Sequence, residues 1–435
     1  MKNFQVIVVA IFIGFAIFGI LVFSGAIKIG DQTDVAGSQG VVVLWGTVKP
    51  ELMTPLIQEF NAENKTFVLQ YVQKFVDTFN DDLLEALASG KGPDIFLIPD
   101  NLAYHYSNKI YTIPYTSYPV ATFKNTFAGA GEVFMTSKGI LAFPIAIDPL
   151  MMYYNRSILD ANNIVYPPAF WDEFINLIPL MTKKDDSKQI SKSAVALGQF
   201  SNVANAKDIL AALFMQTGNP IVKEGSDSNW NGALVVSSNA VNRNSGLGSV
   251  LSFFTSFADP LKESYSWNRS LPYSRDYFSA ENLAFYFGFS SELRTLINKN
   301  PNQNFQVASI PQIKNANFKL TSSHVTGIAI SSSSKNFNTA VTAASLLATS
   351  NFAGKYAAIL GIPPARRDLL SVKLNDAYSP AFYASALYAK SWIDPEKEGT
   401  DLIFKNMIDS VLSNTLTADS AVTDANDKLN LLLLK

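Results

Sequence analysis

The sequence predicts an α/β protein with two lobes. One reason is length, because 435 residues exceed what one ordinary hydrophobic core supports. A second is the alternation of strand and helix patterns over residues 41–100, which is typical of a parallel sheet with helices on both faces. The third is residues 139–155, where one apolar strand leads to a lone Asp148 and another strand follows at once.

The first hundred residues carry the clearest alternation. Each strand is marked by β-branched and aromatic residues, and each helix by apolar residues at helical spacing. The second helix also has an Asn/Asp start and a glycine stop. The expected order is strand 41–46, helix 52–60, strand 66–75, helix 80–90 and strand 93–100.

Asp148 separates two expected strands. The apolar segment "GILAFPIAI" precedes it, and "LMMYYN" follows with two helices behind it. We interpret this restart as the chain leaving one lobe and entering the other, which would turn the carboxylate toward the cleft between them. The alternative is an ordinary turn residue before Pro149.

The remaining chain alternates in the same manner. Residues 223–245 are rich in Ser, Asn and Gly and are expected to form surface loops. A strand is expected to finish at Gly288, with a helix starting at Ser290. The other expected elements are helices 205–218 and 248–260, strands 305–312 and 324–334, helical residues 337–370 and a mainly helical remainder from residue 375.

Two side chains stand where ligands bind in parallel sheets, beyond the carboxyl ends of strands. Trp45 and Asp100 each end a predicted strand, and Asn101 follows the second. Each has a structural alternative: Trp45 as a core residue, and Asp100 with Asn101 as a helix cap.

Composition excludes several classes of function. The chain has no cysteine, which removes disulfides, thiolate metal sites, cysteine catalysis and a lipidated N-terminal cysteine. His105 and His324 are its two histidines, and we expect both to be ordinary surface or core residues and no metal site. The net charge of −2 with scattered Lys and Arg argues against nucleic acid, and no Gly-rich phosphate loop or other cofactor motif is present.

The N-terminus carries a targeting signal. Residues 6–23 contain no charge and follow a single Lys2, which favours a membrane helix with a cytoplasmic N-terminus. A small-residue site at residues 24–26 leaves a cleaved secretion signal open. In both cases the bulk of the protein is exported, and the polar residues 30–40 form a tether.

A set of segments then resembles the extracellular solute-binding proteins, family 1, of ABC importers, in particular their sugar-binding group. The segments occur in the family's order from residue 41 to the C-terminus. They are "VVVLWGT", "FNAEN", "LASGKGPDIFLIPD", "GILAFPIAIDPLMMYYNRSIL", "PAFWDEF", "AFYFGFSSEL", "VASIPQ", "GIAISSSSKN" and "AAILGIPPARRDLL".

The resemblance implies the periplasmic-binding-protein clamshell, in which two lobes, each a mainly parallel sheet flanked by helices, close over a ligand. It implies a first lobe of residues 41–147 and 310–355 and a second of residues 148–309 and 356–435, after an N-terminal membrane or signal segment and tether at residues 1–40. No cofactor or metal is implied.

The resemblance also implies site residues. Asp148 and Asp100 match acidic positions that bind ligand, Trp45 matches a cleft edge, and Phe289 with Ser290 matches a segment that supplies a stacking aromatic. Asn101 stands where the maltose-binding members carry a basic residue, which puts the same sugar specificity in doubt. Further aromatic candidates, each with a core residue as its alternative, are Tyr153, Trp267 and Trp392.

Such residues suit a sugar, whose CH faces stack on aromatic rings and whose hydroxyls bond carboxylates and amides. The implied function is capture of a mono- or oligosaccharide outside the cytoplasm and delivery to ABC importer permease subunits, without catalysis. Alternatives are a polyamine or other solute in the same cleft, a membrane-anchored ligand sensor, and an extracellular glycan hydrolase, which would need a second catalytic acid.

Overall fold

The computed structural model describes residues 40–187, 189–235 and 246–434. Its largest sheet runs in the order β2-β1-β3-β13-β6-β11-β8-β7, with β12 added to β6 and β14 to β13. These strands are β1 (Val41–Gly46), β2 (Val68–Gln73), β3 (Ile95–Pro99), β6 (Ala142–Asn155), β7 (Lys183–Lys184), β8 (Ile190–Val195), β11 (Leu283–Phe289), β12 (Phe305–Ser309), β13 (Thr321–Ile330) and β14 (Ala389–Lys390).

The first part of the chain folds as expected. Strands β1, β2 and β3 are parallel, and two helices, α2 (Pro50–Glu63) and α3 (Phe79–Ala88), connect them. Their apolar residues are buried at the predicted helical spacing, with Met53, Leu56 and Ile57 on α2 and Leu83 and Leu87 on α3. The predicted alternation over residues 41–100 is therefore confirmed.

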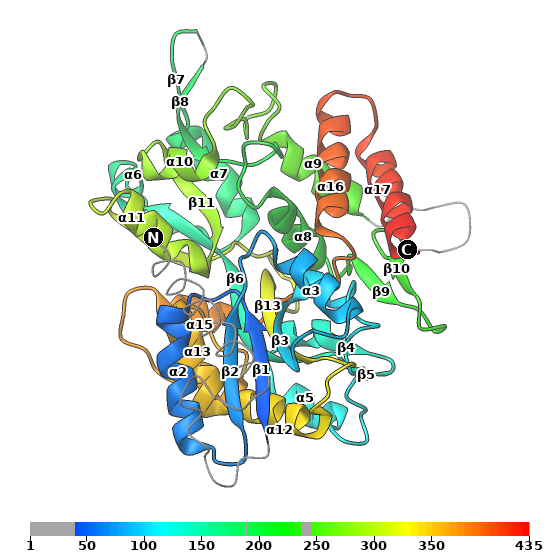
Figure 1. Cartoon of the computed structure of the whole chain (residues 1–435). Coiled ribbons are helices and arrows are strands. Elements are labelled where there is room, and N and C mark those ends of the chain that lie inside the picture. The colour runs from blue at the N-terminus through cyan, green and yellow to red at the C-terminus, as the bar shows by residue number, and fades with distance from the viewer. Residues whose placement is uncertain (1–39, 188, 236–245, 435) are drawn as a thin grey trace, which may run out of the picture.

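Two long strands join the halves of the sheet. The first part of β6 pairs with β13, whereas its second part pairs with β11 on one side and β12 on the other. Figure 1 shows β6 and β13 running between the lower half, with β1 and β2, and the upper half, with β11.

The expected break at Asp148 is wrong, because Asp148 lies inside the continuous strand β6. Pro149 suggested a strand end, since proline cannot donate a ladder hydrogen bond. In the structure Pro149 stands where β6 changes partners from β13 to β11 and β12. It lies opposite Ser323, at the end of the ladder with β13.

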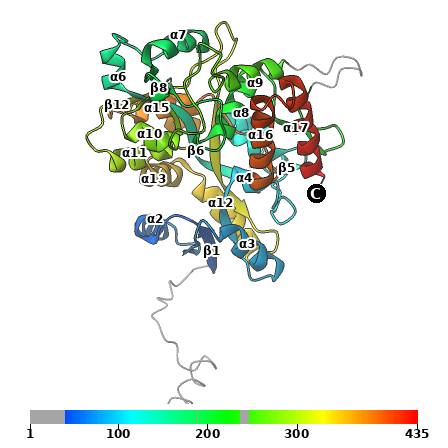
Figure 2. The same ribbon diagram turned by 90° about the horizontal axis from the view of Figure 1, so that it is seen from above.

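Helices cover both halves. In the upper half α16 (Lys397–Leu412) and α17 (Ala418–Leu433) lie side by side against α9 (Leu247–Ser256), as both views show (Figures 1 and 2). In the lower half α13 (Ser350–Leu360) packs on α2. The other helices are α4 (Asp100–Ala103), α5 (Val120–Thr126), α6 (Arg156–Ala161), α7 (Trp171–Met181), α8 (Ala206–Gln216), α10 (Ser274–Ser279), α11 (Leu293–Lys299), α12 (Phe337–Leu347), α14 (Arg367–Leu370) and α15 (Ser379–Ala386), with 3₁₀ turns η1 (Gly129–Phe134) and η2 (Ser290–Glu292).

Two short hairpins complete the fold. They are β4 (Met135–Thr136) with β5 (Gly139–Ile140), and β9 (Val222–Glu224) with β10 (Trp230–Gly232). The second lies in the segment expected to be loops. Its Gly232 amide donates to the Asn430 side chain of α17, 2.7 Å away, which attaches this hairpin to the C-terminal helices.

No helix among the described residues is both long and apolar enough to cross a membrane. The segment expected to anchor the protein, residues 6–23, lies outside the described residues, as does the tether up to residue 39.

Candidate functional site

The first member of the site, Asp100, follows directly after β3. Asp100 is 3% exposed, and its carboxylate accepts hydrogen bonds from the Asn101 backbone amide, at 3.0 Å, and from the Ser391 hydroxyl. Ser391 follows β14, so the C-terminal part of the chain reaches the end of β3 here. The predicted position of Asp100 at a strand end is confirmed.

Opposite this point lies His324 on β13. It is paired across the antiparallel ladder with Asp148 of β6, and directly opposite residues project from the same face of a sheet. The imidazole Nδ1 lies 3.5 Å from an Asp100 carboxylate oxygen, and Nε2 lies 3.7 Å from an Asp208 oxygen. Three carboxylates therefore surround this one ring.

Charge decides the protonation of His324. Burial alone would lower its pKa, but the hydrogen bond to Asp100 and the charges of Asp208, Asp100 and Asp148 outweigh burial and raise the pKa to about 9. The imidazole is therefore a cation at neutral pH. Its side chain is nevertheless 47% exposed, so it stands among carboxylates yet faces solvent.

The pKa values of two neighbouring carboxylates, Asp148 and Asp208, are also shifted. Burial raises the pKa of Asp148, although hydrogen bonds from Ser290 and Ser291 and the charge of His324 act in the opposite direction. The Ser290 hydroxyl donates to Asp148 at 2.6 Å, and the Ser291 amide donates at 2.9 Å. Asp208 on α8 behaves similarly, since burial raises its pKa against the charges of His324 and Lys207.

Lys207 has its own partners. Its ammonium lies 2.9 Å from Asp394 and 2.5 Å from Asp401, and its side chain is only 8% exposed. Burial would lower its pKa, but the two carboxylates outweigh burial and raise it. This ion pair ties α8 to the segment leading into α16.

A small cavity lies beside His324, Asp100 and Lys207. Its volume is about 10 Å³, which is close to the space of one water molecule. Two buried polar atoms among the lining residues, Asn101 Oδ1 and Ser323 Oγ, have no hydrogen-bond partner. The lining residues are Asp100, Asn101, Lys207, Asp208, Ser323, His324, Ser391, Trp392 and Asp394.

Buried polar groups are normally bonded, so two unpartnered ones in one cavity point to a polar ligand or water there. Among the described residues no group of three or more His, Asp or Glu side chains could hold a metal ion.

Two of the predicted aromatic residues adjoin this site. The ring of Phe289 lies 4.5 Å from the His324 ring, measured between centroids, and Trp392 lines the cavity while stacking on Phe404. Ser290 acts through Asp148, as described above. The structure therefore brings six of the nine predicted residues to one region: Asp100, Asn101, Asp148, Phe289, Ser290 and Trp392.

The other three predicted residues lie elsewhere. Tyr153 and Trp267 are completely buried, and their polar atoms are occupied by Phe289 O at 2.9 Å and by the Asn202 side chain at 3.1 Å. Neither lines the cavity, so both are core residues in this structure. Trp45 is half-buried beneath the Lys74 ammonium, which lies 3.9 Å from its ring centre, and it does not line the cavity either.

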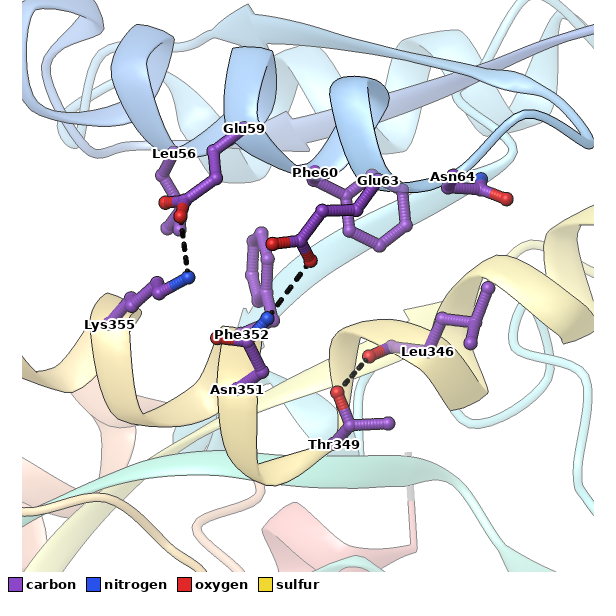
Figure 3. Close-up of a pocket in the computed structure, with 10 residues that line it drawn as sticks. All are labelled: Leu56, Glu59, Phe60, Glu63, Asn64, Leu346, Thr349, Asn351, Phe352 and Lys355. Carbon is purple, nitrogen blue, oxygen red and sulfur yellow. Dashed lines mark hydrogen bonds and ion pairs between the residues drawn. The ribbon is translucent and has the colours of Figure 1, made fainter.

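A larger hollow of about 220 Å³ opens between α2 and α13 (Figure 3). Phe60 and Phe352 meet edge to face within it, with their ring centres 5.8 Å apart. The Lys355 ammonium bonds Glu59 at 2.8 Å across the gap. None of the predicted site residues lines this hollow.

Comparison with known proteins decides the family. Residues 55–381 match the family model described as bacterial extracellular solute-binding protein. The chain belongs to this family. The resemblance found in the sequence is thereby confirmed, and this solute-binding protein has the α/β periplasmic-binding-protein fold. No curated protein sequence matches the chain.

Solved structures show the same fold. A cyclo/maltodextrin-binding protein complexed with maltotetraose is 17% identical, covers 89% of this chain and 96% of its own, and has a TM-score of 0.71. The sugar-binding protein MalE from Xanthomonas citri is 16% identical, with 91% and 97% covered and a TM-score of 0.71. A solute-binding protein from Thermotoga lettingae, bound with α-D-tagatose, is 19% identical, with 91% and 100% covered and a TM-score of 0.62.

Sequence reasoning missed His324, Asp208 and Lys207 in this solute-binding protein. Lys207 and Asp208 carried a weak signal, since both are charged residues within the otherwise apolar segment "AKDILAALFM". His324 likewise interrupts a strand of small and apolar residues. Neither pattern identifies a partner, because their partners are distant in the sequence.

Proposed function

We propose that the chain captures a carbohydrate, a mono- or oligosaccharide, between the two halves of the sheet and delivers it to an ABC-type importer. The observation that carries this proposal is the polar cavity, where Asp100 and Asn101 from one half meet Asp208 from the other. Carboxylate, amide and hydroxyl groups there match sugar hydroxyls, and the Trp392 side chain lines the same cavity.

Ligands bound by similar structures support a sugar. The solved structures hold maltotetraose, α-D-tagatose and, in a protein 18% identical to this chain, mannobiose. These sugars differ in size and linkage, so they favour the class of ligand and leave the particular sugar open.

We further infer that the ligand closes two lobes that separate to admit it. The cavity of about 10 Å³ is far below the roughly 300–1,000 Å³ of ordinary small-molecule sites. A sugar therefore requires a more open arrangement, and a ligand that contacts both lobes favours the closed one.

The lobes we propose follow the expected division, with one change. The boundary expected between residues 355 and 356 falls inside α13, which packs on α2, and the following α14 packs on α5. We therefore assign residues up to 370 to the first lobe and the later C-terminal helices to the second.

The family description places its members outside the cell, which supports an extracytoplasmic location. Residues 6–23 are uncharged and would attach the protein to the membrane, or would be removed if they form a secretion signal. We propose binding without catalysis, since a solute-binding role requires no chemistry on the ligand.

A polyamine is the second candidate, favoured by one observation: Asp100, Asp148 and Asp208 gather around a single site. Isothermal titration of the full-length chain in mild detergent with maltotriose, mannobiose, tagatose and spermidine separates the candidates. Saturable binding of one sugar, weakened in Asp148→Asn but not in the exposed-site control Asp424→Asn, supports the proposal. Binding of spermidine alone would replace the sugar by a polyamine.

A further inference from the structure

The imidazole of His324 occupies the space between two carboxylates that come from opposite halves of the fold. Asp100 begins α4 beside β3, and Asp208 lies in the first turn of α8. The two ring nitrogens face them at 3.5 Å and 3.7 Å. The protonated imidazole thus presents one N–H group to Asp100 and the other to Asp208.

Charged groups around this ring can be assigned element by element. Asp148 faces it from β6, Asp100 from the β3 end, and Asp208 from α8. Phe289 at the end of β11 contributes only its ring. Among the described lining residues the other cation is Lys207, which already bonds Asp394 and Asp401.

We propose that His324 is a built-in counter-cation that sets the charge specificity of the cleft, so that the site takes a neutral polyhydroxyl ligand and rejects cationic ones. This inference deepens the proposed function and rests on it for the class of ligand. His324 holds the position, between two carboxylates, that the ammonium of a diamine or polyamine would need.

Two uncharged polar atoms of the cavity suit a neutral polyhydroxyl ligand. Asn101 Oδ1 can accept a hydrogen bond, and Ser323 Oγ can both donate and accept. A sugar hydroxyl can bond both without disturbing the imidazole. An ammonium ion that bonded Asp100 or Asp208 would lie next to the protonated imidazole, and the two positive charges would repel each other.

The test uses the full-length chain in mild detergent near pH 7 and titrates spermidine into three proteins. In His324→Gln the side chain keeps polar atoms but loses its charge. The matched control, His105→Gln, changes the other histidine, which is exposed and does not line the cavity. We expect the wild type and His105→Gln to bind spermidine at least roughly tenfold more weakly than His324→Gln, the scale of one partly screened charge contact.

The double variant His324→Gln/Asp208→Asn should lose this gain, because one of the two carboxylates becomes neutral. Equal spermidine affinity in the wild type and a folded His324→Gln would overturn the proposal, as would a gain that survives Asp208→Asn. If His324→Gln does not fold, choline, whose charge is independent of pH, should bind the wild type more tightly at about pH 10 than at about pH 7; equal affinity would overturn the proposal.

Failure of the proposed function looks different. If no sugar binds any of the proteins, carbohydrate capture fails, but the spermidine and choline titrations still decide whether His324 controls the ligand charge. If sugars bind and the spermidine affinities are equal, only the role of His324 fails.

Discussion

His324 stands directly opposite Asp148 in the antiparallel ladder between β13 and β6, on the two strands that join the halves of the sheet. A cation and an anion are thus fixed side by side on the crossing strands, where backbone pairing leaves them little freedom. These two charges are therefore positioned by the sheet itself rather than by loops.

The first prediction concerns stability and pH. The pKa of His324 is about 9 in the folded protein against an ordinary value of 6.5. Because the folded state holds this proton more tightly, the stabilisation is fully present below pH 6.5 and is lost as the pH rises through 9. We expect a loss on the order of 1 kcal/mol in the free energy of unfolding, since the half-exposed ring is screened by water.

Urea unfolding near pH 6 and pH 10 would measure this loss, with His324→Gln as the control. The raised pKa values of Asp148 and Asp208 also lower stability as the pH rises through them, and the charge of His324 acts on both carboxylates. The difference between the two proteins therefore reports the imidazole together with its effect on Asp148 and Asp208. Equal pH dependence in both proteins would contradict the prediction.

The second prediction concerns Lys207. Its ammonium is buried with Asp394, so Lys207→Met leaves a buried carboxylate unpaired and should lower the free energy of unfolding by about 3–5 kcal/mol. Lys428→Met removes an exposed ion pair with Asp424, in which both side chains are nearly half exposed, and should cost less than about 1 kcal/mol. Similar losses in the two variants, measured by urea unfolding, would show that burial of the pair has no special effect.

A third prediction compares two glycines with nearly the same φ angle. Gly198 has φ of +86° and Gly218 has φ of +87°, so alanine is strained at both. At Gly198 a Cβ atom would also lie 2.7 Å from the Ala258 backbone nitrogen, whereas at Gly218 its nearest neighbour would be the Phe318 ring at 4.0 Å.

We therefore expect Gly218→Ala to lose about 1 kcal/mol, the scale of backbone strain alone, and Gly198→Ala to lose at least about twice as much. Thermal unfolding of both variants would test this difference. Equal melting temperatures would mean that the backbone around Ala258 moves aside at little cost.

The sequence predicted the fold better than the site, and the reason is physical. Helices and strands depend on spacing between neighbouring residues, so β1 to β3 with their helices could be identified from residues 41–100. Asp100 and Asp148 could be selected because each follows an apolar strand pattern. That the second strand continues through Pro149 could not be foreseen, because it depends on which strands pair beside it.

The missed residues depend on contacts between distant segments. His324, Asp208 and Asp100 meet only because β13 lies beside β3 and α8 packs against β13, and no local pattern encodes this. The aromatic candidates divide for a related reason. Tyr153, Trp267 and Phe289 are all buried, and only the packed fold decides that the Phe289 ring lies against His324 while the other two do not.

The last prediction uses two buried serine hydroxyls that have no hydrogen-bond partner among the described residues, Ser323 in the cavity and Ser266 away from it. Both side chains are buried, at 3% and 0% exposed, and a buried hydroxyl without a partner costs free energy. Ser323→Ala and Ser266→Ala should therefore each raise the free energy of unfolding of the ligand-free protein by about 1 kcal/mol.

The two variants should differ in ligand binding. If Ser323 meets a sugar hydroxyl, Ser323→Ala loses a hydrogen bond of about 1 kcal/mol, which is roughly a fivefold loss of affinity, while Ser266→Ala binds as the wild type does. Urea unfolding without ligand and titration with the sugar that binds the wild type measure the two effects separately. A Ser323→Ala variant that becomes more stable and still binds with full affinity would mean that this hydroxyl makes no contact with the ligand. Because stability and affinity are expected to change in opposite directions at Ser323, general damage to the fold cannot imitate this result.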